Sequence, residues 1–168
     1  MPRSFDASVD FPVTVDQVHS ALCDEDYWQA RIAAFQAGTA TLDSLTVDSD
    51  DTVTVAVSLG VSRDRLPALV TKLAGGDLEW TQTQRWSPVG RDRVRGEINM
   101  AVARVSASAA GQGLLVPDGN GSRLDLTGTV KVKVPVVGGA IERFLGSQLG
   151  NDLRAFERFT TEWIAENH

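Results

Sequence analysis

Few side chains in this sequence have the types and spacing that acid–base, nucleophilic or metal chemistry requires. Histidine occurs only as His19 and His168, and neither belongs to a Ser/His/Asp or Cys/His arrangement. Because His19 lacks such partners, we expect it at the surface or at the boundary of the core. Cys23 is the single cysteine, so an internal disulfide and a cysteine-based metal site are both excluded.

A group of acids and two glycine pairs are the remaining candidates for ion or phosphate binding. Asp48, Asp50 and Asp51 could hold a hard cation, but a calcium loop would also need a central glycine and a distal glutamate. The acids are therefore interpreted as a turn. The pairs at 75–76 and 138–139 do not form a phosphate-loop motif. We expect no metal ion and no cofactor.

The segment 78–86 alternates so that Trp80, Gln82, Gln84 and Trp86 share one face of a predicted strand. Aromatic side chains with a few polar groups are typical of the wall of a small-molecule pocket. The same pattern also fits two tryptophans that fill the core, with the glutamines near an edge. The sequence leaves both interpretations open.

Arg104 shares the strand parity of Met100 and Val102, so a regular strand would point its charge inward. In that position it could pair with a ligand carboxylate or with an acidic residue of the protein. A slip in register would place the side chain in solvent instead, and this is the simpler interpretation.

The elements that must position these residues follow from hydrophobic periodicity. A strand over 4–11 precedes two short helices, over 14–22 and 25–36, and Thr14 with Gln17 forms a capping box for the first. A short helix is predicted over 66–74, and Gly96 suggests a bulge or bend in its strand. The remaining predicted strands cover 41–47, 52–59, 78–86, 93–102, 105–116 and 124–134.

The last segment, 139–165, has the longest helical pattern. Its apolar stripe includes Ile141, Leu145, Leu149, Leu153 and Phe156. This stripe is first of all a core face, and only its middle is a candidate for the wall of a cavity. Gly146 and Gly150 each weaken the helix by about 1 kcal/mol, which suggests that another group approaches closely on that face.

The composition fits a single domain over residues 1–168, with 42% hydrophobic and 23% charged residues. A net charge of −6 disfavours nucleic-acid binding, because an acidic surface repels phosphate. No transmembrane segment and no signal peptide are recognisable, so we expect a cytoplasmic protein. The sequence specifies no oligomeric state.

The predicted order of elements resembles the START-like superfamily (SRPBCC), which includes the birch-pollen allergen. Within this superfamily, the chain resembles an uncharacterised actinobacterial family of unknown function. The local resemblance rests on Arg95-Gly96-Glu97, on Pro135, and on the Val-Val-Gly-Gly run at 136–139 that leads into Ile141 and Glu142. The resemblance implies an α+β helix-grip fold. In this fold a curved antiparallel sheet of six to seven strands wraps around a long C-terminal helix, with two short helices after strand 1.

Members of this superfamily commonly bind apolar or amphipathic ligands between sheet and helix, so the resemblance implies a similar pocket here. Our leading hypothesis is a binder or carrier of a hydrophobic small molecule, such as a lipid or polyketide-like compound. A cyclase or dehydratase would need an acid or base there, for which Glu97, Arg104, Tyr27 and the glutamines are candidates. A protein-interaction module would need a large exposed apolar patch. The candidate cavity residues are Trp28, Phe35, Trp80, Gln82, Trp86, Met100, Arg104, Leu126, Val130, Leu145, Leu149 and Leu153.

Overall fold

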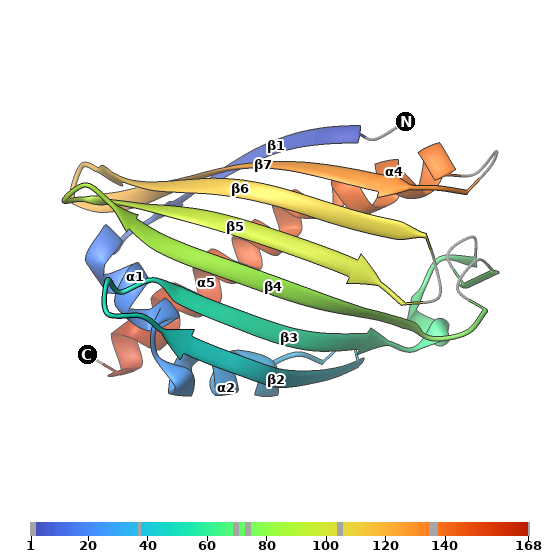
Figure 1. Cartoon of the computed structure of the whole chain (residues 1–168), viewed down its shortest axis with the longest axis horizontal. Helices are drawn as coiled ribbons and strands as arrows, with labels where there is room; N and C mark the ends of the chain where they lie inside the picture. Colours follow the sequence, from blue (N-terminus) through green and yellow to red (C-terminus); the bar gives the residue numbers. More distant parts are fainter. Residues whose placement is uncertain are drawn as a thin grey trace.

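Seven antiparallel strands form one curved sheet in the computed structural model, which describes residues 3–36, 38–68, 71–72, 75–103, 106–134 and 138–167. The strand order across the sheet is β1-β7-β6-β5-β4-β3-β2 (Figure 1). The predicted sheet of six to seven strands is therefore confirmed. The strands are β1 (Arg3–Phe11), β2 (Gly38–Val47), β3 (Val53–Val61), β4 (Leu78–Val89), β5 (Arg93–Val102), β6 (Ala107–Asp118) and β7 (Gly121–Val132).

The helices lie on one face of this sheet, which we call the inner face. Helices α1 (Val15–Leu22) and α2 (Glu25–Ala33) follow β1, and α4 (Gly138–Ser147) and α5 (Leu149–Asn167) end the chain. In Figure 1 all of them lie behind the sheet, and α5 crosses it diagonally. This arrangement is the expected helix-grip fold, in which the opposite, outer face of the sheet is left to solvent.

The two short helices begin at side-chain caps. The Gln17 amide N–H donates to Thr14 Oγ1 at 3.2 Å, and the Thr14 N–H donates to Gln17 Oε1 at 2.9 Å. The predicted capping box is thus confirmed. Asp24 caps α2 by accepting the Asp26 N–H at 2.9 Å. Helix α2 ends at Ala33, three residues before the predicted boundary.

The predicted long C-terminal helix is confirmed over residues 138–167, with one interruption that was not predicted. A turn at Gln148 separates α4 from α5. The weak helix formers Gly146 and Gly150 flank this turn. Only one of them has the close neighbour that the sequence suggested. A methyl group on Gly146 would overlap the ring of Phe5 on β1, whereas a methyl group on Gly150 would have ordinary space.

Gly96 does not produce a bulge, and that prediction was wrong. The β4–β5 register is continuous through the pair Trp86 and Gly96. The glycine instead makes room for an aromatic ring, because a Cβ at this position would overlap the Trp86 indole. A register shift is found between Leu42 and Ser44, on the edge strand β2.

Two predictions cannot be compared fully with the structure. Of the helix predicted over 66–74, residues 69–70 and 73–74 lie outside the described ranges. The Thr71 N–H donates to the Pro67 carbonyl oxygen at 3.0 Å, and a short 3-10 helix covers Arg63–Arg65. Arg104 lies outside the described residues as well, directly after β5.

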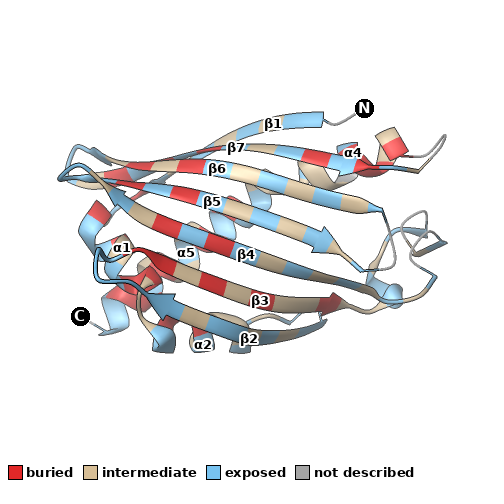
Figure 2. Ribbon diagram, viewed as in Figure 1, coloured by how far each residue is buried: buried red, intermediate tan, exposed pale blue. Residues whose placement is uncertain are grey.

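The core lies at one end of the sheet, under α1, α2 and α5 (Figure 2). Its centre is aromatic. The ring of Tyr27 contacts Trp28 and Trp163, each with a centroid distance of 5.4 Å. The rings of Phe11 and Phe156 lie 5.6 Å apart, joining β1 to α5. We call this cluster the packed core.

We predict that Gly96→Ala destabilises the protein by about 1–3 kcal/mol, because Trp86 is only 2% exposed and its ring cannot move away from a new methyl group. Gly128→Ala is the matched control, since a Cβ on this inward-facing strand glycine would meet only a carbonyl oxygen at 3.7 Å. Its free energy of unfolding should change by less than about 1 kcal/mol. Urea unfolding of both variants tests this, and equal stabilities would contradict it.

Candidate functional site

Burial of the inner face ends halfway along the sheet. The inward-facing residues of β3 to β6 are buried up to a line through Val57, Gln84, Gly96 and Gly113. Beyond this line the inward-facing side chains keep intermediate exposure to solvent, as the change from red to tan in Figure 2 shows. We call this second half of the inner face the accessible wall. Its principal residues are Leu59, Trp80, Gln82, Met100, Val102 and Ala109.

Strand register brings these distant residues together. Trp80 lies opposite Leu59 on one side and Val102 on the other. Met100 lies between Gln82 and Ala109 in the same way. Beyond Met100 several inward-facing residues of β6 and β7 are small, and Ala107 and Ala109 pack against the cluster that Val130, Val132 and Ile141 form. These small residues are Ala107, Ala109, Gly111 and Gly128.

Trp80 and Trp86, which the sequence pattern could not distinguish, have different environments in the structure. Trp86 lies in the packed core, where its Nε1–H donates to Gln84 Oε1 at 3.0 Å. Trp80 is half-buried in the accessible wall. Its Nε1 is buried, and it has no hydrogen-bond partner in the described part of the chain. An indole N–H without a partner is costly in a protein interior, so Trp80 is the polar group of the wall with unused hydrogen-bonding capacity.

The other candidate cavity residues fall into three places. Trp28, Leu126 and Leu153 are buried in the packed core, and the Trp28 indole donates to the Leu22 carbonyl oxygen at 2.7 Å. Val130 belongs to a second, smaller cluster at the other end of the sheet, and Leu145 packs against that cluster.

Phe35 follows the end of α2, and Leu149 begins α5 and packs against the packed core; both are half-buried. Together with Trp80, Gln82, Met100 and Leu145, they are the described candidates that keep intermediate exposure. Ligand contact by any of these residues stays a prediction.

Two of the candidate acids and bases, Glu97 and Tyr27, lie away from the accessible wall. Glu97 points to the outer face and is exposed, because its parity on β5 is opposite to that of Met100. The Tyr27 side chain is fully buried, and its hydroxyl lies 2.7 Å from Thr160 Oγ1. Strand alternation alone could have placed Glu97 outward.

Glu142 is a buried carboxylate that no sequence signal marked as important beyond the family resemblance. It is 2% exposed, and its Oε2 accepts the Val132 N–H at 2.9 Å. This hydrogen bond joins α4 to the end of β7. The contact gives Glu142 a structural role, since it satisfies a backbone donor at the point where the sheet ends.

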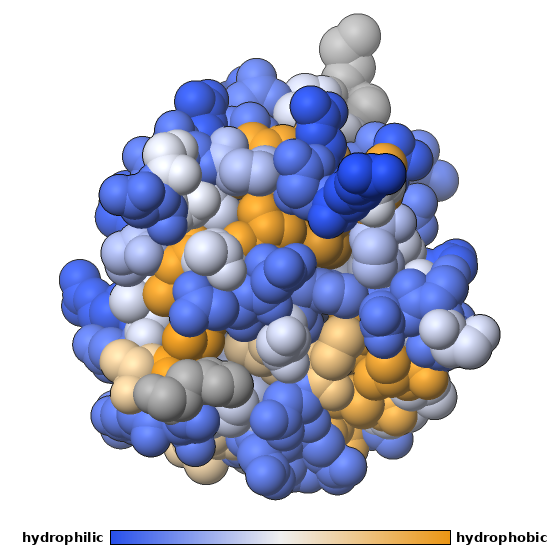
Figure 3. Space-filling view, turned by 90° about the vertical axis from the view of Figure 1, so that its left-hand side faces the viewer, coloured by the Kyte–Doolittle hydropathy of each residue, from blue (hydrophilic) through white to orange (hydrophobic). Residues whose placement is uncertain are grey.

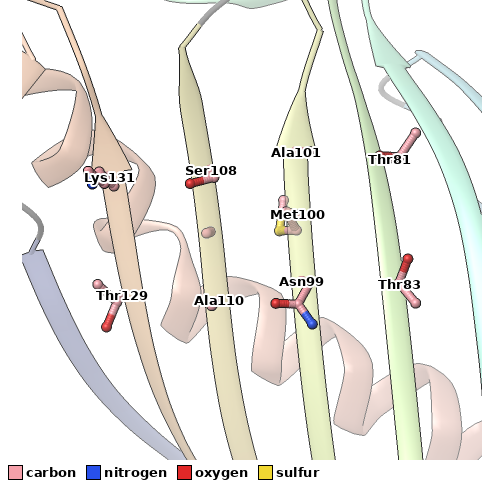
Figure 4. A pocket seen from close by; sticks show the side chains of 10 residues that line it. Thr81, Thr83, Asn99, Met100, Ala101, Ser108, Ala110, Thr129 and Lys131 are labelled. Atoms are coloured by element: carbon pink, nitrogen blue, oxygen red, sulfur yellow. The ribbon is translucent and has the colours of Figure 1, made fainter.

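The outer face carries two shallow hollows of about 410 and 500 Å³. They share Asn99, Ala110 and Thr129, and the first also includes Thr81 and Lys131 from neighbouring strands (Figure 4). Polar atoms dominate the lining of the second hollow, whereas apolar atoms dominate that of the first. Apolar ligands favour enclosed pockets, and both outer hollows are open to solvent.

Apolar surface outside the accessible wall is limited in the described residues. Figure 3 shows apolar groups between polar ones at the end of the molecule that faces the viewer. Val47, at the end of β2, is 43% exposed and is the exposed large hydrophobic residue within the described ranges. A single valine does not make the extended patch that protein–protein recognition commonly uses.

With the fold and the accessible wall described, the chain can be compared with known proteins. Residues 6–164 match the family described as "Protein of unknown function (DUF2505)". The chain belongs to the DUF2505 family. An uncharacterized protein of Mycobacterium tuberculosis is similar to it, with 37% identity over 173 residues, covering 99% of each chain.

Solved structures similar to this DUF2505 protein share its fold at low identity. A protein from Thermus thermophilus has a TM-score of 0.58 and 15% identity, covering 99% of this chain and 100% of the other. A START superfamily protein from Mycobacterium smegmatis has a TM-score of 0.53 and 12% identity, covering 98% of this chain and 99% of the other. The di-domain ARO/CYC BexL of the BE-7585A biosynthetic pathway has a TM-score of 0.58 and 12% identity, covering 96% of this chain and 49% of the other. The predicted START-like fold is confirmed.

None of the described helices has the length and apolar content that a membrane-spanning helix needs. Within the same residues, no group of three or more histidine, cysteine, aspartate or glutamate side chains is arranged to hold a metal ion. His19 is half-buried on α1, with its Nε2 at 3.6 Å from Cys23 Sγ.

The thiol of Cys23 should be unreactive in this DUF2505 protein. Burial, and secondarily the negative charge of Asp51, raise the pKa of Cys23 from 9.0 to about 11. At pH 8, iodoacetamide should therefore modify the folded protein roughly 100-fold more slowly than the urea-unfolded chain, because only the thiolate reacts. Mass spectrometry of timed samples measures both rates, and similar rates would show that the thiol is not protected.

The same shift makes stability depend on pH in the alkaline range. The unfolded chain loses the Cys23 proton near its ordinary pKa of 9.0, before the folded protein does at about 11. The stabilisation that follows from the raised pKa of Cys23 is therefore fully present below pH 9. It is lost as the pH rises through 11, where the folded protein also loses the thiol proton.

Proposed function

We propose that this protein binds a hydrophobic or amphipathic small molecule, such as a lipid or a polyketide-like compound, against the accessible wall. The observation that carries the proposal is the incomplete burial of inward-facing apolar side chains on β3 to β6. Leu59, Met100 and Val102 point toward the helices, yet they keep contact with solvent. Covering such surface is favourable, because burial of apolar area contributes roughly 25 cal/mol per Å².

The composition of the wall fits a binding surface for a mainly apolar molecule. Aliphatic side chains and the Trp80 ring supply contact area, and Gln82 supplies a polar amide group. Such a combination is usual for small-molecule sites, where a few polar groups orient the ligand. The likeness to a START superfamily protein and to an ARO/CYC protein supports the proposal at the level of the fold.

A binding function is favoured over catalysis by the side chains that form the wall. General acid–base catalysis needs a group with a suitable pKa within hydrogen-bond reach of the substrate. The named wall residues are aliphatic, indole, thioether and amide groups, which do not titrate near neutral pH. Glu97, one of the acids considered from the sequence, lies on the other face of the sheet.

We predict that Ala109→Phe greatly weakens binding of the neutral fluorescent probe N-phenyl-1-naphthylamine. Ala109 is half-buried on the inner face, so a phenyl ring there would occupy the space in front of Met100. The matched control is Ala110→Phe. Ala110 is the next residue on β6 and points to the outer face, so its variant should bind the probe as the unmodified protein does.

Fluorescence titration measures both affinities, and thermal unfolding verifies that each variant is folded. Native mass spectrometry of the protein as purified should also show a bound small molecule, which Ala109→Phe loses and Ala110→Phe keeps. Equal probe binding by the two variants would place the site elsewhere. An unmodified protein that binds no apolar probe would refute the proposed function.

A further inference from the structure

Helix α2 places a positive charge on its inward face. Tyr27 and Trp28 are buried, and Arg31 and Phe35 follow at one-turn intervals with intermediate exposure. The spacing of 27, 28 and 31 puts these side chains on one face of α2, and Phe35 follows just after the helix ends. Arginine is rarely placed on such a face unless it has a partner.

The Arg31 guanidinium is held in place by aromatic rings. Its central carbon lies 5.2 Å from the centroid of the Trp28 ring and 4.8 Å from that of Phe156 on α5. Stacking of this kind contributes about 0.5–2 kcal/mol and fixes the plane of the guanidinium. Within the described part of the chain, Arg31 makes no ion pair and no side-chain hydrogen bond, so its N–H donors are available.

Arg31 stands where the packed core ends on both helices. Along α2 it lies between buried Trp28 and half-buried Phe35. Along α5, Phe156 and Leu153 are buried, whereas Leu149, one turn further, is half-buried. The guanidinium therefore lies at the border between the packed core and the region that the accessible wall faces.

The carboxylate of Asp152 lies close enough for the charge of Arg31 to influence it, but no ion pair joins the two among the described residues. Asp152 lies one turn before Phe156 on α5. Although Asp152 as a residue is exposed, partial desolvation of its carboxyl group raises its pKa, and the charge of Arg31 opposes that shift. The two charges influence each other without direct contact.

We infer that the bound molecule is an anionic amphiphile, whose carboxylate binds the Arg31 guanidinium while its apolar tail lies against the accessible wall. This inference rests on the proposed function and adds the chemical class of the ligand. A planar guanidinium matches a carboxylate through two parallel hydrogen bonds. The flanking rings of Trp28 and Phe156 prevent the side chain from turning fully into solvent.

Competition titrations with two probes of equal chain length test the inference. Sodium dodecanoate and 1-dodecanol, both below their aggregation limits, displace N-phenyl-1-naphthylamine from the unmodified protein and from its variants. Arg31→Met should weaken dodecanoate binding about 10- to 100-fold, the effect of losing a hydrogen-bonded charge pair. Its binding of dodecanol should be unchanged, which also shows that the variant is folded. Arg31→Lys should lose less than Arg31→Met, because it keeps the charge.

Two further variants separate a specific contact from general electrostatics. Asp152→Asn removes the competing carboxylate and should strengthen dodecanoate binding a few-fold, with no effect on dodecanol. Arg158→Met is the matched control, because Arg158 is an exposed arginine on the same helix α5; its variant should bind both probes as the unmodified protein does. An unchanged affinity of Arg31→Met for dodecanoate would overturn the inference while dodecanol binding still upheld the proposed function. Failure of both probes to bind would overturn both.

Discussion

The hydroxyl groups of Tyr27 and Thr160 lie 2.7 Å apart and join α2 to α5 inside the packed core. Both residues are fully buried, so neither hydroxyl has water as an alternative partner. The Tyr27 ring also contacts Trp28, Phe159 and Trp163. Because these contacts fix α2 relative to α5, they also fix the position of Arg31 and the line at which burial of the inner face ends.

The accessible wall lies between two apolar clusters, each held by a different C-terminal helix. Helix α5 belongs to the packed core, whereas α4 packs Ile141 against Val130 and Val132 of β7. The buried Glu142 hydrogen bond to the Val132 amide ties α4 to the sheet at that end. The turn at Gln148 separates the two helices, and each of them contributes apolar side chains to its own cluster.

Much of the fold could be predicted from the sequence, because the signals involved are local. Strand alternation correctly assigned Val53, Val55 and Val57 to one face, and the Thr14 capping box marked the start of α1. The break in the last helix was not predicted, since its apolar stripe runs through 148 without interruption. The role of Gly96 was missed for a similar reason. A glycine in a strand permits either a bulge or a close ring, and only the pairing with Trp86 decides between them.

The candidate site was harder to predict, because it depends on contacts between strands. Trp80 and Trp86 have the same parity on β4, but Trp86 faces Gly96 and Trp80 faces Leu59 and Val102. Cross-strand neighbours, which a single sequence does not reveal, therefore decided which tryptophan is buried and which keeps exposure. Trp28, Leu126 and Leu153 are buried among the aromatic rings that fill one end of the sheet, and a ligand contact by these residues stays a prediction.

Arg31 shows why the boundary between the two halves is chemically distinct. The sequence pattern predicted a helix over 25–36 without assigning Arg31 a role, and the structure places its guanidinium over the rings of Trp28 and Phe156. A methionine at this position would cover the same rings without the cost of removing a charge from water. A charge kept where packing alone favours an apolar group is the kind of local conflict that functional sites contain. Since aromatic stacking satisfies the face of the guanidinium but not its N–H groups, the remaining hydrogen-bonding capacity is directed to a partner that the protein itself does not supply among its described residues.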